Sequence, residues 1–303
     1  MLLGNLFEHR HKPEVLIPGV FVKSLTYVGV ELEFSSLGDH VPQLTYWTWH
    51  SDGSIRGERT GELVLHAPTT PLEFDEAVNE YYAKVARDVA VNGSCGMHVH
   101  IDVCDLTVDE LRGVLLFYSV LERTLYKYCG DGRDGNNFCV PLWECWDKVG
   151  WLGKNFTVDN SLRYCGLNLA AIRKFGSIEF RMHPGVVDAG KMARWVGLCA
   201  RIKEYGRTCT VDSVYNLLQS TPSRTSLEQV TGTREFLSST LGDSAHLLVP
   251  YCDREDLFKG AVDGKEVYFS SSLRASNKRL ARTPTKRAVK SLYIPYNVWQ
   301  GEV

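Results

Sequence analysis

The sequence has no marked excess of charge of either sign. Its 303 residues include 34 Lys and Arg against 36 Asp and Glu, which gives a formal net charge of −2. A dedicated nucleic-acid binder is therefore not expected, because such proteins are globally basic. With 44% hydrophobic and 23% charged residues, the chain has an ordinary globular composition and is long enough to bury a large core.

The sequence also lacks any apolar run near the ~20 residues that a membrane-spanning helix needs. The stretch MLLGNLFEHRHKPE at the N-terminus has only a short apolar part and no small-residue cleavage signal. The nine cysteines form no C-x-x-C pair, and the spacing of Cys139 and Cys145 fits no common zinc motif. We therefore expect a cytoplasmic protein with reduced thiols and no membrane segment.

The order of the expected elements predicts an α+β fold. Strands are expected over residues 21–35, 44–50, 62–66, 95–103, 163–172 and 176–183, and helices over 71–92, 107–129, 188–206 and 226–241. Because the strands and helices show no regular βαβ rhythm, we expect a twisted, mainly antiparallel sheet with helices on one face. The other face of the sheet is then free.

The chain divides into three expected parts. They are an N-terminal entry segment (1–20), a main domain (21–245) that contains an irregular insertion (130–160), and a basic C-terminal extension (246–303). A G-x-G-x-x-G pattern in the insertion follows a helix instead of a strand, so it does not predict a dinucleotide site. Residues 274–290 are rich in Lys and Arg without an acid; a solvated surface is the expected role, and nucleic-acid contact is the alternative.

Four of the expected strands separate charged from aliphatic side chains. In YVGVELEFSS, residues 27–36, Glu31 and Glu33 alternate with aliphatic and aromatic residues, so the two carboxylates share one face of the strand. A half-solvated strand would explain this pair alone. The other strands repeat the pattern, however, and His183 is expected on the same side. The combined charged face holds Glu31, Glu33, Glu62, His98, His100, Glu179 and Arg181.

This set of residue types indicates a divalent metal ion with a phosphate ligand. Neighbouring carboxylates repel one another unless cations neutralise them, and oxygen ligands are those that Mg²⁺ and Mn²⁺ prefer. Arg181 could hold a phosphoryl oxygen in its planar guanidinium. The H-x-H pair of His98 and His100 is also a ligand pattern of zinc hydrolases, and either ring alone is compatible with a structural histidine.

Several motifs in order resemble those of a known family. GVELEF, SDGS followed by GELVLHAP, CGMHVHID, LN and SIEFRMHPG, over about residues 27–200, resemble the amidoligases, relatives of glutamine synthetase and glutamate–cysteine ligase. The resemblance implies a glutamine synthetase-like sheet whose concave face binds ATP and Mg²⁺ or Mn²⁺. It also implies that a small-molecule or peptide carboxylate is joined to an amine through an acyl phosphate, so that residues 21–245 form an amidoligase-like domain.

The resemblance also implies a role for each matching residue. Expected metal ligands are Glu31, Glu33, Glu62, His98 and Glu179. Asp52 and Glu62 are expected to deprotonate the incoming amine, and Arg181 to hold the transferred phosphate, with His98 and His100 contacting metal or phosphate. We expect the side chains of six residues to converge on one cavity: Glu31, Glu33, Glu62, His98, Glu179 and Arg181. The stretches HAPTT and HPGVVD depart from the family pattern, which leaves the substrates open, and no family pattern is visible beyond residue 210.

Two alternatives remain open at this point. A zinc-dependent hydrolase using His98, His100 and an acid would contain zinc and act without nucleotide. A non-catalytic relative would bind nucleotide, or nucleic acid through the basic C-terminal region, without forming ADP.

Overall fold

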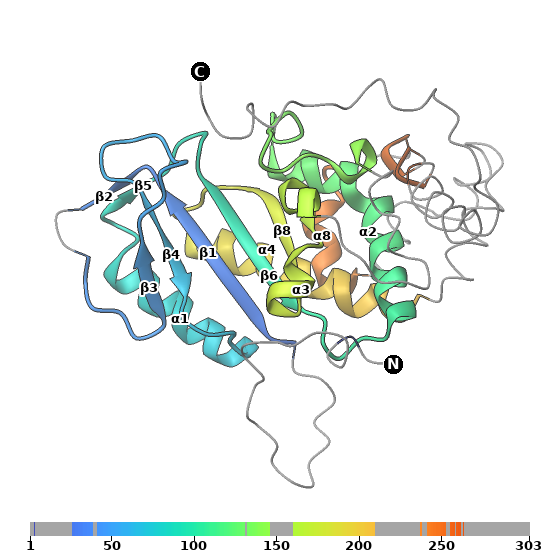
Figure 1. Ribbon diagram of the computed structural model, residues 1–303, viewed down its shortest axis with the longest axis horizontal. Helices are drawn as coiled ribbons and strands as arrows, with labels where there is room; N and C mark the ends of the chain where they lie inside the picture. The colour runs from blue at the N-terminus through green and yellow to red at the C-terminus, as the bar shows by residue number, and fades with distance from the viewer. Residues whose placement is uncertain are drawn as a thin grey trace, which may run out of the picture.

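The fold centres on one antiparallel sheet with helices packed against it (Figure 1). The computed structural model describes residues 3, 26–38, 41–130, 132–145, 160–209, 237, 241–252, 255–257, 259–261 and 263. Within them the expected α+β class is confirmed. The expected helix at 226–241 falls almost wholly outside the described residues, and the basic segment 274–290 lies entirely outside them.

The main sheet has six strands in the order β3-β4-β1-β6-β8-β7, and every neighbouring pair is antiparallel. The strands are β1 Val28–Phe34, β3 Trp47–His50, β4 Gly61–Leu65, β6 Gly96–Asp102, β7 Leu167–Asn168 and β8 Ser177–Pro184. Strands β2 Ser36–Leu37 and β5 Val89–Ala90 form a separate two-stranded sheet. This order puts β1, β6 and β8, which carry most of the predicted site residues, side by side.

The helices lie behind the sheet and at one end of it, as Figure 1 shows. They are α1 Pro71–Lys84, α2 Val108–Cys129, α3 Ala171–Phe175, α4 Ala189–Gly206 and α8 Ala245–Leu248, with short 3₁₀ turns η2 Leu142–Glu144, η5 Asn160–Tyr164 and η6 Gly242–Ser244. Helix α4 contacts β6, and α2 contacts both α4 and β8. Among the described helices, none has the length and apolarity needed to span a membrane.

Capping residues fix the ends of the long helices. Thr107 and Glu110 form a capping box at the start of α2, and Gly130, with φ of 99°, ends this helix. The Asp188 side chain accepts a hydrogen bond from the backbone N–H of Lys191 and so caps α4. Such caps satisfy backbone N–H groups that have no partner within the first helical turn.

Two expected elements differ from the structure. The helix expected over 71–92 ends at Lys84, because Val89 and Ala90 pair with Ser36 and Leu37 instead. The strand expected over 163–172 keeps only the two residues of β7, between η5 and α3. Here the Asn168 side chain accepts the backbone N–H of Ala170 at 2.8 Å, a local bond that turns the chain out of the sheet.

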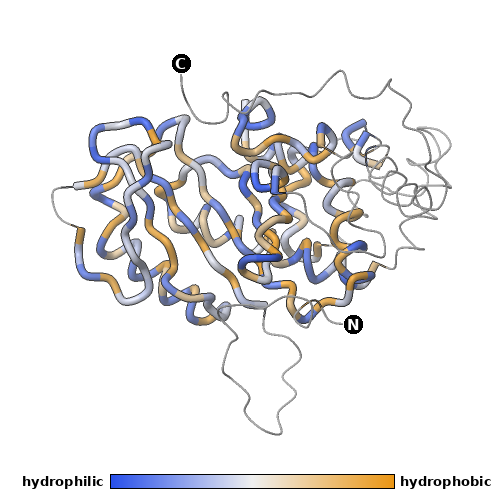
Figure 2. Tube along the Cα trace, in the orientation of Figure 1, coloured by the Kyte–Doolittle hydropathy of each residue, from blue (hydrophilic) through white to orange (hydrophobic). Residues whose placement is uncertain are grey.

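The aliphatic face of the sheet forms the core, as the strand alternation predicts. Val30, Leu32, Val99 and Phe180 are buried, and Trp195 of α4 packs against Phe180 with ring centroids 6.4 Å apart. Figure 2 shows hydrophobic and hydrophilic colours alternating along the central strands. The helices pack on the apolar side of the sheet, and they do not cover the charged side.

His183 does not lie on the charged face, contrary to the expectation. The pairing of β6 and β8 shifts register between Met97 and Val99, so that His183 lies opposite the core residue Met97. Its ring packs 5.1 Å from the ring of Trp195. A β-bulge inserts one residue into a strand and reverses the facing of the residues beyond it. Arg181 and Met182 lie between the two registers, and Arg181 keeps the predicted side next to Glu179.

A buried glutamate links α2 to the segment that follows it. Glu122 is 1% exposed, and its Oε1 accepts the Tyr118 hydroxyl at 2.8 Å and the Leu142 N–H at 2.7 Å. The Trp143 N–H donates to Oε2 at 3.4 Å. Burial outweighs these bonds and raises the pKa of Glu122 to about 8.

We therefore predict that this carboxyl makes stability depend on pH. Between its ordinary pKa of 4.5 and about 8, the unfolded chain releases the proton while the folded chain retains it. The folded state then binds more protons, so the free energy of unfolding falls as pH rises through this interval. Glu122→Gln keeps both bonds to one oxygen and cannot ionise. In urea unfolding, the variant should gain stability relative to wild type between pH 6 and pH 9; a constant difference would contradict the prediction.

Candidate active site

Strand register brings the predicted acids and histidines face to face. Glu31 of β1 lies opposite His98 of β6, and Glu33 of β1 lies opposite Glu62 of β4. His100 of β6 lies opposite Glu179 of β8. Opposite residues in antiparallel strands point to the same side with Cβ atoms ~5 Å apart, so these pairs form one continuous polar surface.

His98 lies at the centre of this surface and contacts three carboxylates. Its Nδ1 is 3.0 Å from Glu31 Oε2 and 3.6 Å from Glu179 Oε1, and its Nε2 is 3.6 Å from Glu33 Oε1. Burial acts to raise the pKa of Glu31, but hydrogen bonds from His100 and His98 hold it well below its ordinary value. Glu31 is therefore ionised and available as a ligand at neutral pH.

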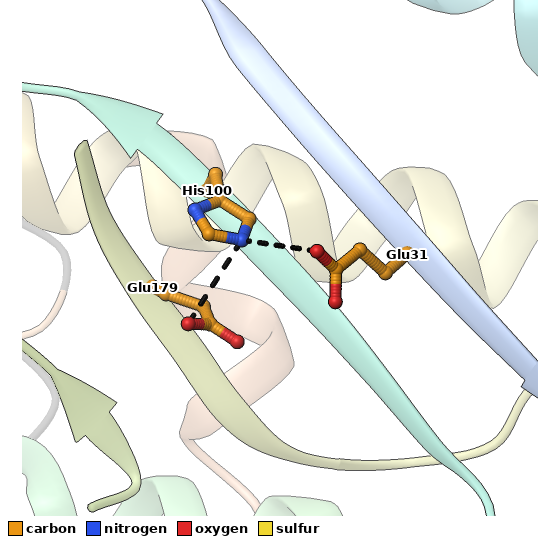
Figure 3. A group of neighbouring side chains, drawn as sticks. All are labelled: Glu31, His100 and Glu179. Atoms are coloured by element: carbon orange, nitrogen blue, oxygen red, sulfur yellow. Dashed lines mark ion pairs between the residues drawn. The ribbon is translucent and has the colours of Figure 1, made fainter. Parts of the chain in front are cut away.

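The first possible metal-binding group consists of Glu31, His100 and Glu179 (Figure 3). His100 Nε2 lies between the two carboxylates, 3.5 Å from Glu31 Oε1 and 3.9 Å from Glu179 Oε2. Its Nδ1 is 2.9 Å from Ser177 Oγ, which fixes the ring orientation. Although burial lowers it, the pKa of His100 is raised overall because Glu179 and Glu31 favour the imidazolium.

The second group consists of Glu33, Asp52 and Glu62, whose ligand oxygens lie within 4.8 Å of one another. Glu33 is 8% exposed and accepts the Gly96 N–H at 2.5 Å. Burial, together with the charges of Glu31, Asp52 and Glu33, raises the pKa of Glu62 to about 7. These carboxylates therefore repel one another in the absence of a cation.

Asp52 reaches this group from a loop between β3 and β4. Its Oδ1 accepts the Ser54 N–H at 2.7 Å, and its backbone oxygen accepts the Thr60 hydroxyl at 3.2 Å, which closes the loop at both ends. Gly57 lets this loop lie directly on the end of β1, since a Cβ atom there would be 1.9 Å from the carbonyl oxygen of Ser35. The position of Asp52 therefore depends on a glycine five residues away.

Arg181 and Glu179 form an ion pair on β8. The Nε of Arg181 also donates to the Phe138 carbonyl oxygen at 3.1 Å, so the guanidinium is held from two sides. Burial acts to lower the pKa of Arg181, but the Glu179 charge and hydrogen bond raise it, as do the charges of Glu31 and Glu33. The guanidinium group of Arg181 therefore remains cationic.

Two residues that sequence reasoning did not assign support this site. Asn168 donates a hydrogen bond to Glu179, and Arg133 donates from Nε to the Met182 carbonyl oxygen at 2.9 Å. The LN motif contains Asn168 and could have suggested a role for it. Arg133 carries no sequence signal, because its partners are backbone oxygens that no side-chain pattern reveals.

Two cavities open on the charged face and share Glu31. One, of about 810 Å³, is polar and is bounded by β1, β4, the Asp52 loop and the segment around Phe138. The other, of about 440 Å³, is mostly apolar and contains Val64, His100 and Phe175. Volumes of ~300–1,000 Å³ suit small-molecule ligands, so each could hold one.

The predicted residues are distributed over these two cavities. Those that line the polar cavity are Glu31, Glu33, Asp52, Glu62, His98 and Arg181. His100 lines the apolar cavity, and Glu179 joins the two through its contacts with His98, His100 and Arg181. The structure thus brings all eight predicted residues together. Their roles as ligands or catalysts stay predictions.

Comparison with known families agrees with the resemblance found in the motifs. Residues 38–149 match the family described as "Putative amidoligase enzyme", so this part of the chain is similar to that family. The matched range contains Asp52, Glu62, His98 and His100. Comparison with curated proteins gave no significant match.

The chemistry of the site fits divalent cations. Five carboxylates converge on this face, those of Glu31, Glu33, Asp52, Glu62 and Glu179. Arg181 lies among them and forms an ion pair with Glu179. Clustered oxygen donors with one or two imidazoles fit Mg²⁺ or Mn²⁺ better than zinc, which prefers fewer ligands rich in nitrogen or sulfur. Glu31, His100 and Glu179 could hold one ion, and Glu33, Asp52 and Glu62 a second.

We predict that Glu62→Gln has opposite effects on stability and on metal binding. Removing one of three mutually repelling carboxylates should stabilise the metal-free protein at pH 8 by about 1 kcal/mol, after allowance for solvent screening. The same change should reduce the rise in Tm on adding Mn²⁺. Glu58→Gln, an exposed carboxylate on the Asp52 loop, is the matched control and should do neither. A metal-induced rise unchanged by Glu62→Gln would rule out Glu62 as a ligand.

Proposed function

We propose that the protein is an ATP-dependent carboxylate–amine ligase that forms an amide bond with Mg²⁺ or Mn²⁺ in the site. The observation that carries the proposal is the pair of potential metal-binding groups, within one sheet face, next to an arginine that is ion-paired with Glu179. Phosphoryl transfer is catalysed mainly by positioning and by neutralising charge, and this arrangement supplies both. The family match over residues 38–149 supports the same reaction class.

The different polarity of the two cavities supports binding of a different substrate in each. In this proposal, the apolar cavity receives the adenine and ribose of ATP, because its lining is mostly apolar, with Glu31, Asp102 and Lys174 as its charged side chains. The polar cavity receives the carboxylate and the amine. Glu31, shared by both, lies where the γ-phosphate would meet the substrate carboxylate. The open side of the sheet then serves as the concave face of a glutamine synthetase-like fold.

The reaction proceeds in two steps. First, a carboxylate oxygen of the substrate attacks the γ-phosphorus of ATP, ADP leaves, and an acyl phosphate forms. Arg181 stabilises the transferred phosphoryl group, and bound divalent cations neutralise charge on the phosphates. Second, the amine attacks the acyl carbon and phosphate leaves with the bonding electrons. Glu62 or Asp52 accepts the proton that the amine loses, a role that suits a carboxyl whose pKa is raised to about 7.

The hydrolase alternative makes a different prediction for the same residues. Hydrolysis by a zinc ion on His98 and His100 would need both imidazoles on one ion. His98 Nδ1 and His100 Nε2 each lie beside Glu31, at 3.0 and 3.5 Å, so one ion bound by Glu31 could meet both rings. Activity without nucleotide and zinc in the purified protein would favour this reading.

We predict magnesium-dependent release of ADP and phosphate when the protein is given ATP with pools of carboxylic acids and amines. Glu179→Gln removes a ligand from the first group and weakens the hold on Arg181, so the rate should fall by about 10²–10³-fold. Glu58→Gln, which lines neither cavity, should retain the wild-type rate. Robust turnover by Glu179→Gln would defeat the proposal.

The assignment of the apolar cavity has its own test. Val64→Phe places a larger side chain in that cavity and should raise the KM for ATP by about tenfold while leaving the KM for the carboxylate nearly unchanged. Val41→Phe, at an exposed position outside both cavities, is the control. Equal changes in both KM values would instead place the nucleotide elsewhere.

A further inference from the structure

The polar cavity has positive groups on its rim as well as negative groups on its floor. Arg56 and Arg163 both line it, and both are exposed. No carboxylate of the described residues forms an ion pair with either guanidinium, in contrast to Arg181, which pairs with Glu179. The guanidinium groups of Arg56 and Arg163 could therefore bind an anion at the rim, in addition to Arg181, which the proposed function places at the phosphate.

The backbone of Arg56 is fixed to a neighbouring loop. Its N–H donates to Ser94 Oγ at 2.9 Å, and its carbonyl oxygen accepts from Asn92 Nδ2 at 2.6 Å. Asn92 and Ser94 also line the polar cavity, and Ile55, next to Arg56, is buried. Arg56 is thus held at the rim by bonds that do not involve its guanidinium.

Arg163 is positioned by aromatic contacts. Its guanidinium carbon lies 4.9 Å from the centre of the Tyr164 ring, and that ring is 6.2 Å from the ring of Phe138. The Phe138 carbonyl oxygen in turn accepts the Arg181 Nε–H. This chain of contacts connects the rim arginine to the arginine at the proposed site of phosphoryl transfer.

We propose that the amine accepted in the polar cavity carries a carboxylate of its own, as a free amino acid does. The inference rests on the proposed ligase function and names its amine substrate class. Glu33, Asp52 and Glu62 carry three negative charges, so with one divalent ion bound the floor keeps one net negative charge that attracts an ammonium group. That charge alone would attract polyamines equally well. Guanidinium groups at the rim repel a second cation and bind a carboxylate in planar geometry. A zwitterion matches both ends of the cavity.

The test compares each of the common amino acids with its decarboxylated amine and its N-acetyl derivative. Binding is measured by calorimetry with the full chain, Mg²⁺ and ADP. At least one amino acid should bind at least tenfold more tightly than its amine, which lacks the carboxylate, and than its N-acetyl form, which lacks the ammonium. Amines that bind as well as their amino acids would overturn the inference, as would the absence of binding by every amino acid.

Variants of the rim arginines sharpen the test. Arg56→Gln and Arg163→Gln should each weaken amino-acid binding by about three- to tenfold, the range for an exposed charge-assisted contact. They should leave binding of the decarboxylated amine unchanged. Arg173→Gln, an exposed α3 arginine that lines neither cavity, should have no effect. Arg56→Glu should reverse the preference and favour cadaverine over lysine.

The outcome separates this inference from the ligase proposal. If amino acids bind in a way that depends on Arg56 and Arg163 but no ADP is released, the zwitterion site is supported and the ligase function is contradicted. Release of ADP that depends on Glu179, but is equal for amino acids and simple amines, would retain the ligase and reject the zwitterion site. Arginine variants that bind amino acids as wild type does would also reject it.

Discussion

Repulsion between carboxylates held together on one sheet face is the constraint on which the site depends. Glu31 and Glu33 lie on β1, Glu179 lies on β8, and β6 between these strands pairs with both, so backbone pairing sets their separation. The protein offsets the repulsion with His98 between the three acids and Arg181 beside Glu179. The remaining repulsion destabilises the fold, and a cation bound between the carboxylates would relieve it.

The rest of the fold keeps this face rigid. The aliphatic side of the same strands is covered by α4 and α2, so each strand is held by close packing on one side and by hydrogen bonds along both edges. The capped start of α2 and the buried Glu122 fix the segment that reaches Phe138 and touches Arg181. Packing far from the charged face thus determines where its arginine points.

Strand alternation was enough to predict the central part of the site. A period of two placed Glu31, Glu33, His98 and Glu179 on one face, and antiparallel pairing did bring them together. The same rule failed at His183, because a bulge depends on pairing with another strand and leaves no mark in the residue types. It also failed for residues 163–172, where a side-chain bond to the backbone competed with the sheet.

The loop-borne parts of the site were harder to predict. Asp52 was found only through its motif, and Arg133 not at all, since its partners are carbonyl oxygens of a distant strand. The two cavities and the rim arginines depend on how loops fold over the sheet, which periodicity does not describe. The strand residues of the site could therefore be predicted from the sequence, whereas the loop residues around it could not.

Gly57 shows that the position of the Asp52 carboxylate depends on a residue that is not itself a candidate ligand. The space between its α-carbon and the carbonyl of Ser35 excludes even one methyl group. A related chain could keep every acidic residue yet carry alanine here, and its Asp52 loop would have to lift away from the sheet. When relatives are judged active or inactive, the absence of a side chain at this position is therefore as informative as the presence of the carboxylates.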